Sequence, residues 1–189
     1  KLPYFDYIRW TDYETAELGV KYTDILGKWE RVTFCSREAN VTITRITKSS
    51  LGAKINMTLS LQDCWSLRGF GNGNEKDMHY KKLVDKDATY ISLIAHYPSY
   101  EGSELKDGGW CGFTKVIAVG GEKERVVLDN TNDSENVAKE QNAAIKISGA
   151  DEVYLITKSD RTFDMGKFED FKDAENYALL DELNAYTTA

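Results

Sequence analysis

Strict alternation of apolar and polar residues is the feature that most constrains the fold of this chain. Ile55, Met57, Leu59 and Leu61 alternate with polar residues over one whole segment, which is the spacing of a half-buried β-strand. Eight further segments are rich in Val, Ile, Thr, Tyr and Phe, the residue types that favour strands; they cover residues 18–23, 29–36, 41–48, 89–97, 113–119, 125–128, 143–148 and 152–158. Nine short strands predict more than one sheet.

Glycine-containing turns separate these segments at residues 24–27, 48–52, 120–122 and 149–151. Glycine adopts positive φ without steric cost, so such turns favour hairpins between antiparallel neighbours. No helix of 10–15 residues separates the strands, which argues against a parallel α/β sheet. We therefore predict a mainly β fold, a two-sheet antiparallel sandwich with a helix at its C-terminal end.

The periodicity changes near the C-terminus. Phe168, Phe171 and Leu183 follow helical spacing with acidic residues on the opposite face, which predicts one amphipathic helix from residue 165 to about residue 186. We divide the chain into a β-sandwich domain at 1–163, incomplete at its N-terminal end, and a helical segment at 164–189. The apolar side of the helix either closes the sandwich core or faces a missing partner.

Charge and composition exclude several classes of function. The formal net charge is −7 over 189 residues, whereas binding to nucleic acid needs clustered Lys and Arg. No stretch approaches the roughly 18 apolar residues of a membrane span. The cysteines Cys35, Cys64 and Cys111 lack C-x-x-C spacing, so no metal site is predicted. We expect Cys35 to be buried and leave the disulfide state of the three cysteines open.

Several segments resemble the N-terminal domain of glycoside hydrolase family 95. In that domain an arginine, an acidic residue and a Thr-Ala pair precede a V-x-Y strand and an R-x-x-F-x-S strand. Here the matching stretches are residues 7–17, 20–22 and 31–36, and the similarity continues at 41–46, 115–121 and 149–157. Order and spacing agree across nearly the whole chain.

The resemblance implies a parent enzyme of the α-L-fucosidase type. Members of the family carry an N-terminal β-sandwich, a helical linker, a catalytic (α/α)₆ barrel and a C-terminal β domain, and the barrel holds the catalytic acid and base. The segment at 164–189 would match the start of the linker. The expected partner is thus the catalytic helical barrel of the same parent chain, and an oligosaccharide is a second candidate partner.

Within the chain itself we predict no catalytic residue and no cofactor. No serine lies in a G-x-S-x-G motif, the setting of an α/β-hydrolase nucleophile. Aromatic residues in glycine-rich surroundings are the better candidates, because the apolar faces of sugar rings stack on Trp and Tyr. We single out Trp65, Tyr100 and Trp110 as candidate carbohydrate contacts, with Trp110 exposed at a loop; the alternative is that they pack in the core or against the barrel.

Three functions remain open from the sequence. The first is a non-catalytic domain that braces and borders a fucosidase-like barrel, which we favour. The second is an autonomous carbohydrate-binding module. The third is a small β-sandwich hydrolase complete in itself, which the lack of an acid/base or nucleophile motif disfavours.

Overall fold

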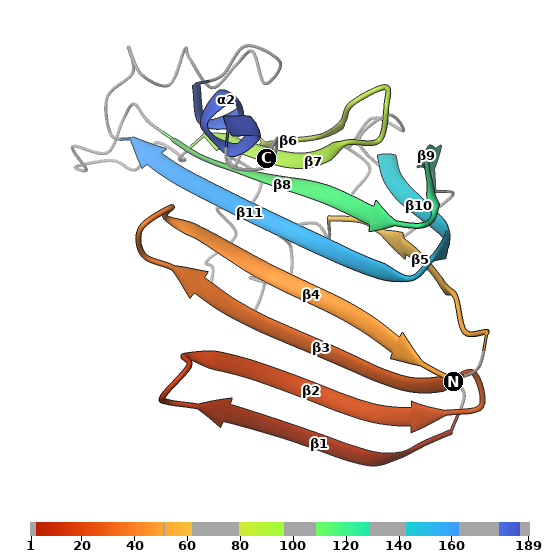
Figure 1. The fold of residues 1–189 in the computed structure, drawn as a ribbon. Coiled ribbons are helices and arrows are strands. Elements are labelled where there is room, and N and C mark those ends of the chain that lie inside the picture. Colours follow the sequence, from red (N-terminus) through yellow and green to blue (C-terminus); the bar gives the residue numbers. More distant parts are fainter. Residues whose placement is uncertain are drawn as a thin grey trace, which may run out of the picture.

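The computed structural model describes residues 3–50, 52–61, 80–96, 109–128, 143–162 and 178–185. Within these ranges the protein has one eight-stranded sheet, one three-stranded sheet and one short C-terminal helix (Figure 1). Every pair of neighbouring strands in both sheets is antiparallel. The predicted fold class is confirmed.

The large sheet has the strand order β1-β2-β3-β4-β11-β8-β7-β6. β11 pairs with β4 on one side and with β8 on the other, so it joins the N-terminal four strands to the rest of the sheet. The edge strands are β1 and β6. The strands are β1 (Tyr4–Asp12), β2 (Glu17–Asp24), β3 (Gly27–Ser36), β4 (Val41–Ser49), β6 (Tyr80–Val84), β7 (Tyr90–His96), β8 (Gly109–Val119) and β11 (Glu152–Thr162).

The small sheet has the order β5-β10-β9, with β5 (Ile55–Leu59), β10 (Ala143–Ala150) and β9 (Glu122–Val127). Two basic side chains of the edge strand β9 reach backbone carbonyls of the large sheet: Lys123 Nζ donates to Val116 O at 2.7 Å, and Arg125 Nε donates to Val84 O at 3.2 Å. Charged residues that point inward protect an edge strand from pairing with other chains.

Three of the predicted hairpin turns are in fact connections between the two sheets. The turn at 24–27 joins the paired strands β2 and β3, as expected. The turns at 48–52, 120–121 and 149–151 instead lead from β4 to β5, from β8 to β9 and from β10 to β11, and each pair of strands lies in different sheets. Glycine permits the positive φ seen at Gly120 and Gly149 in either case, so turn chemistry did not distinguish a hairpin from a sheet-to-sheet corner.

The two faces of the large sheet are covered by different layers. We call face A the side that carries Phe113 and Lys158, which are paired across β8 and β11. Face B is the side that carries Val116 and Val153, because each lies an odd number of residues from its strand's face A residue. The small sheet covers part of face B. Side chains of β5 and β10, which include Ile55, Ile145 and Ile147, form one core with large-sheet residues. The large sheet contributes Ile46, Val116 and Val153.

On face A, the helix α2 (Ala178–Ala185) forms a second core. Leu179, Leu180 and Leu183 of α2 pack with Cys111 and Phe113 of β8. Figure 1 shows the helix over β8 and β11, on the side away from the small sheet. At the same layer boundary the buried Lys158 of β11 lies 2.6 Å from the Glu182 carboxylate of α2.

The predicted helix began at residue 165, and only its last part falls within the described residues. Phe168 and Phe171 lie outside them. The apolar side of the helix was expected either to close the core or to face a missing partner. Leu183 is completely buried, so this residue closes the core. Among the described residues, no helix is long and apolar enough to cross a membrane.

Strands β1 and β2 extend beyond both covering layers. In Figure 1 they lie at one end of the large sheet, with neither α2 nor the small sheet over them. The ten exposed large hydrophobic residues of the described ranges are concentrated here: eight lie between residues 4 and 26, namely Tyr4, Phe5, Tyr7, Ile8, Tyr13, Leu18, Ile25 and Leu26. Among the described residues, no second layer packs on either face of this extension.

Candidate functional site

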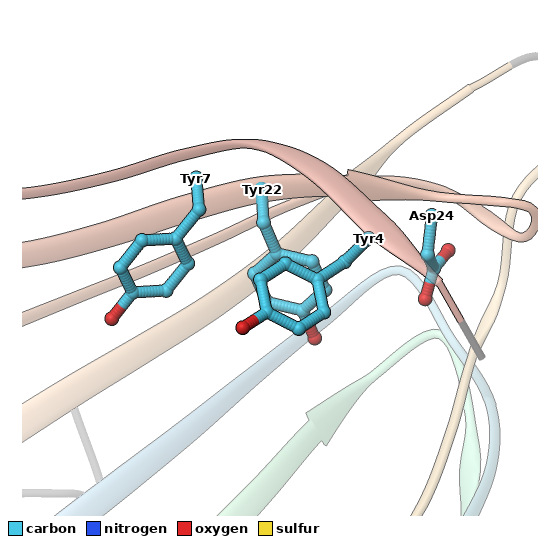
Figure 2. Close-up of a pocket in the computed structure, with 4 residues that line it drawn as sticks. All are labelled: Tyr4, Tyr7, Tyr22 and Asp24. Atoms are coloured by element: carbon cyan, nitrogen blue, oxygen red, sulfur yellow. The ribbon is translucent and has the colours of Figure 1, made fainter. Parts of the chain in front are cut away.

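A hollow of about 280 Å³ lies on face B of the β1–β2 extension, lined by Tyr4, Tyr7, Tyr22 and Asp24. We call it the tyrosine hollow. In Figure 2 the three phenol rings and the carboxylate project to the same side of the strands, with the hydroxyl groups at the outer ends. The Tyr4 ring centroid is 5.9 Å from that of Tyr7 and 6.2 Å from that of Tyr22. The rings are tilted by 59° and 70°, so they form walls rather than a flat platform.

An aromatic row continues from the hollow towards the core. Tyr22 lies opposite Trp29 across β2 and β3, and their rings are stacked at 6.4 Å with an interplanar angle of 17°. Lys48 Nζ lies 4.9 Å from the Trp29 ring centroid on the next strand, which is within cation–π range. Trp29 packs against the sandwich core. Tyr22 is therefore held by a partly buried neighbour that packs on the core, whereas Tyr4 and Tyr7 stand on the edge strand.

Local backbone features place the two edge tyrosines. Asp6 has a φ of 53°, and the register of β1 against β2 shifts between Phe5 and Ile8, as in a β-bulge. An extra residue reverses the alternation of faces. Tyr4 and Tyr7 consequently reach the same face although their separation is three residues.

Asp24 closes one end of the hollow. Its Oδ1 accepts a hydrogen bond of 2.7 Å from the backbone N–H of Leu26 in the β2–β3 turn. Burial and the nearby Asp24 charge raise the pKa of Tyr22 above its usual 10.0. The Tyr22 hydroxyl is therefore a neutral group at physiological pH, able to donate or accept a hydrogen bond.

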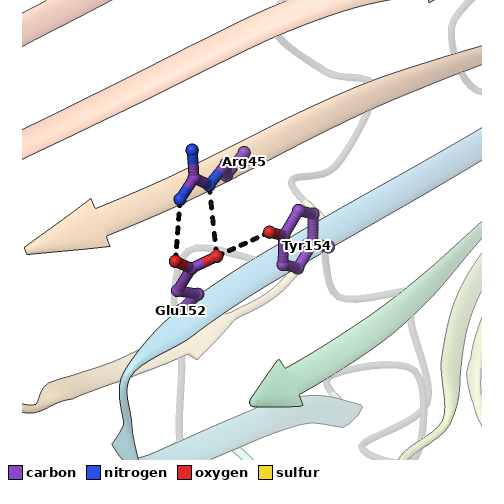
Figure 3. Close-up of polar contacts among 3 residues, drawn as sticks. All are labelled: Arg45, Glu152 and Tyr154. Atoms are coloured by element: carbon purple, nitrogen blue, oxygen red, sulfur yellow. Dashed lines mark hydrogen bonds and ion pairs between the residues drawn. The ribbon is translucent and has the colours of Figure 1, made fainter.

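A second polar cluster lies on face A. Arg45 donates from Nη2 to Glu152 Oε1 at 2.7 Å and from Nε to Oε2 at 3.1 Å, and the Tyr154 hydroxyl donates to the same Oε2 at 2.5 Å (Figure 3). Hydrogen bonds from Arg45 and then from Tyr154 lower the pKa of Glu152 below its ordinary 4.5. A carboxyl group held ionised in this way is unsuited to act as a general acid. The cluster ties β4 to β11.

We expect Arg45→Gln to reduce stability by less than about 1 kcal/mol at neutral pH, because the ion pair is largely exposed. The folded-state pKa of Glu152 is lowered. The contribution of the ion pair to the free energy of unfolding is therefore present above the unfolded-state pKa and is lost as the pH falls through the folded-state pKa. The difference in urea midpoint between the two proteins should therefore shrink below about pH 4.5. A difference that is equal at about pH 7 and about pH 3 would contradict this assignment.

Face A of the extension carries three apolar side chains of β1, those of Phe5, Ile8 and Trp10, and polar or charged side chains that include Thr23, Lys21, Asp12 and Glu17. Phe5 and Ile8 are exposed there, and the Trp10 indole covers Gly19 of the paired strand so closely that a Cβ at Gly19 would overlap the ring. Lys21 Nζ lies 5.8 Å from the Trp10 ring centroid. The extension thus presents a side of mixed apolar and charged residues on face A and a tyrosine-rich side on face B.

Of the three aromatic residues singled out from the sequence, Trp110 falls within the described residues, and it is not among those that line the hollow. Trp65 and Tyr100 lie outside the described residues. Trp110 lies in strand β8 and not in a loop, and it is partly buried. It pairs with Arg161, about ten residues along the strands from the end that holds the hollow, or roughly 30 Å. Its contact with carbohydrate stays a prediction.

The described residues hold no group of three or more His, Cys, Asp or Glu side chains that could bind a metal ion. Cys111 is buried, but Cys35 is exposed, contrary to expectation. Cys35 faces Thr42 near the end of β3 and β4, on a part of face B that the small sheet does not cover. Both are free thiols, and Cys64 lies outside the described residues.

Comparison with known proteins gives little further information. No family model matches the chain, and no curated protein matches it. One similar solved structure is described as "Putative kojibiose phosphorylase from human microbiome", with a TM-score of 0.44 and 10% identity. The match covers 97% of this chain and 24% of that one, so the chain spans about a quarter of that carbohydrate-active protein. A similarity this low does not establish a family, and the resemblance to glycoside hydrolase family 95 stays a prediction.

Proposed function

We propose that this chain is a non-catalytic domain of a carbohydrate-active enzyme. More narrowly, we propose that it braces and borders the helical catalytic barrel of an α-L-fucosidase-like glycoside hydrolase. The observation that carries the proposal is the row of apolar side chains that β1 presents on face A of the extension: Phe5 and Ile8, which are exposed, and Trp10, which is partly buried. Large exposed apolar surfaces mark interaction sites.

The shape of this surface suits a packing role. It is a sheet face built from paired strands, which is rigid, and the bidentate Arg45–Glu152 pair lies on the same face, on β4 and β11 beyond β3. An apolar centre with satisfied polar groups at its border is the usual anatomy of a protein interface. A helical domain offers the matching partner, because helices pack flat against sheet faces.

The carboxyl groups that the structure describes favour this role over catalysis. Asp12 and Glu152 both have a pKa below the ordinary value, Asp12 mainly because its carboxylate accepts a hydrogen bond from the backbone N–H of Glu14. Inverting hydrolysis of a glycoside needs one carboxylic acid with a raised pKa opposite a carboxylate base. A self-contained hydrolase is therefore the weakest of the three candidate functions.

The packing role predicts a difference in accessibility between the isolated chain and the complete parent protein. We expect hydroxyl-radical labelling of Phe5, Ile8 and Trp10 in the isolated chain and strong protection of all three in the protein expressed from the whole reading frame. Tyr13, 92% exposed in the β1–β2 turn, is the internal control and should be labelled in both. Equal labelling of Phe5 and Trp10 in the two proteins, or a reading frame without a helical domain, would refute the bracing role.

Activity provides a separate test. We expect the isolated chain to release no nitrophenol from nitrophenyl α-L-fucoside, while the complete protein does, because binding energy without reacting groups gives no turnover. Turnover by the isolated chain that is lost on substituting one of its own carboxyl groups would favour the self-contained hydrolase.

A further inference from the structure

We propose that the tyrosine hollow is a binding site for a neutral saccharide. The site is independent of the packing role of face A, because it lies on the opposite face of the extension. Its residues are Tyr4, Tyr7, Tyr22 and Asp24, none of which was singled out from the sequence.

The hollow combines the two kinds of group that a sugar ring requires. The ring walls of Tyr4, Tyr7 and Tyr22 offer apolar surface for the C–H faces of a pyranose. Within the described part of the chain, the three hydroxyls and Asp24 Oδ2 have no hydrogen-bond partner, while Asp24 Oδ1 is occupied by Leu26 N–H. Figure 2 shows these groups in a row on one side of the strands, where they can bond to sugar hydroxyls.

The site is partly organised before any ligand binds. Tyr22 is stacked on Trp29, which is anchored in the core, and the Asp24 side chain is fixed by its bond to the turn. Side chains that are already ordered lose less conformational entropy on binding. At about 280 Å³ the hollow is slightly smaller than the roughly 300–1,000 Å³ of sites that enclose drug-sized ligands. It therefore suits one or two sugar rings rather than a long buried chain.

Charge narrows the ligand class. Asp24 and the net charge of −7 disfavour uronates, sialates and phosphates. A quaternary ammonium group could also lie against aromatic walls, but it would leave the tyrosine hydroxyls and their hydrogen-bonding capacity unused. The arrangement thus favours a neutral saccharide over a cation.

The test is titration of the chain with cellobiose, maltose and an L-fucose-containing trisaccharide, followed by ligand-observed NMR and by Trp fluorescence, with choline chloride and glucuronate as comparison ligands. At least one neutral saccharide should give a saturable signal. Tyr22→Ala and Tyr4→Ala should each weaken that binding about tenfold, which corresponds to about 1.4 kcal/mol. Asp24→Asn should weaken it less, since the amide oxygen can still accept the Leu26 bond.

Tyr13→Ala is the matched control, because Tyr13 is an exposed tyrosine on the same hairpin outside the hollow; it should bind as the unchanged protein does. Tyr4 stands on the exposed edge strand, so Tyr4→Ala keeps the test decisive if Tyr22→Ala unfolds. Saturable binding of choline without binding of any saccharide would overturn the proposal, as would saccharide binding that all hollow variants retain or the absence of any saturable signal. None of these results would alter the protection of face A in the complete protein, so this proposal and the packing role can fail separately.

Discussion

Replacing Phe113 by alanine is expected to lower the free energy of unfolding by about 3–5 kcal/mol. Phe113 is completely buried in the core between face A and α2, with the Tyr90 ring centroid at 6.0 Å. Removing the ring takes away its apolar burial and leaves a cavity that the surrounding strands cannot fill without breaking their pairing. For a chain of this length the midpoint of thermal unfolding should fall by about 6–20 °C.

Phe5→Ala is the matched control for this loss. It removes the same ring from the exposed edge of the same sheet, where little apolar area leaves water on folding, and should cost about 1 kcal/mol or less. Urea denaturation of both variants measures the contrast. Similar losses for Phe113→Ala and Phe5→Ala would mean that the layer between face A and α2 is not a packed core.

The sequence predicts most strands because period-two patterning reflects burial on one side. The prediction of strands fails where a bulge interrupts the alternation, or where a strand contains few apolar residues. In β1 the bulge at Asp6 puts Tyr4 and Tyr7 on one face at an odd spacing, so the segment does not alternate. β6 is a short edge strand whose sequence includes two lysines. Lys82 is nevertheless buried, with its Nζ 3.4 Å from Leu61 O, an arrangement that only tertiary contacts can specify.

The candidate site was partly within reach of sequence reasoning. If the turn at 24–27 closes a hairpin, Asp24 lies opposite Gly27. Two residues further along each strand, Tyr22 then lies opposite Trp29, as the structure shows. Tyr4 and Tyr7 could not be added, since the bulge conceals their register. The sequence also gave no sign that β5, β9 and β10 leave the first sheet, and without that knowledge the uncovered extension cannot be recognised. Glycine-rich surroundings, as around Trp110, indicate an exposed aromatic side chain. They do not indicate which other side chains lie beside it on the same face of a sheet.

Leu183→Ala should destabilise the protein by about 2–5 kcal/mol, because Leu183 is completely buried and α2 shares one core with β8. Asp181→Ala on the exposed side of α2 is the control; it should be nearly neutral, since the loss of a favourable charge in the first helical turn is offset by the higher helix propensity of alanine. If the helix served only as a linker to another domain, truncating Leu183 would leave the isolated chain unchanged. The decisive measurement is a double-mutant cycle with Phe113→Ala by urea denaturation. Residues of one core should show a coupling free energy of about 0.5–3 kcal/mol, whereas strictly additive losses would place the helix outside the core of this domain.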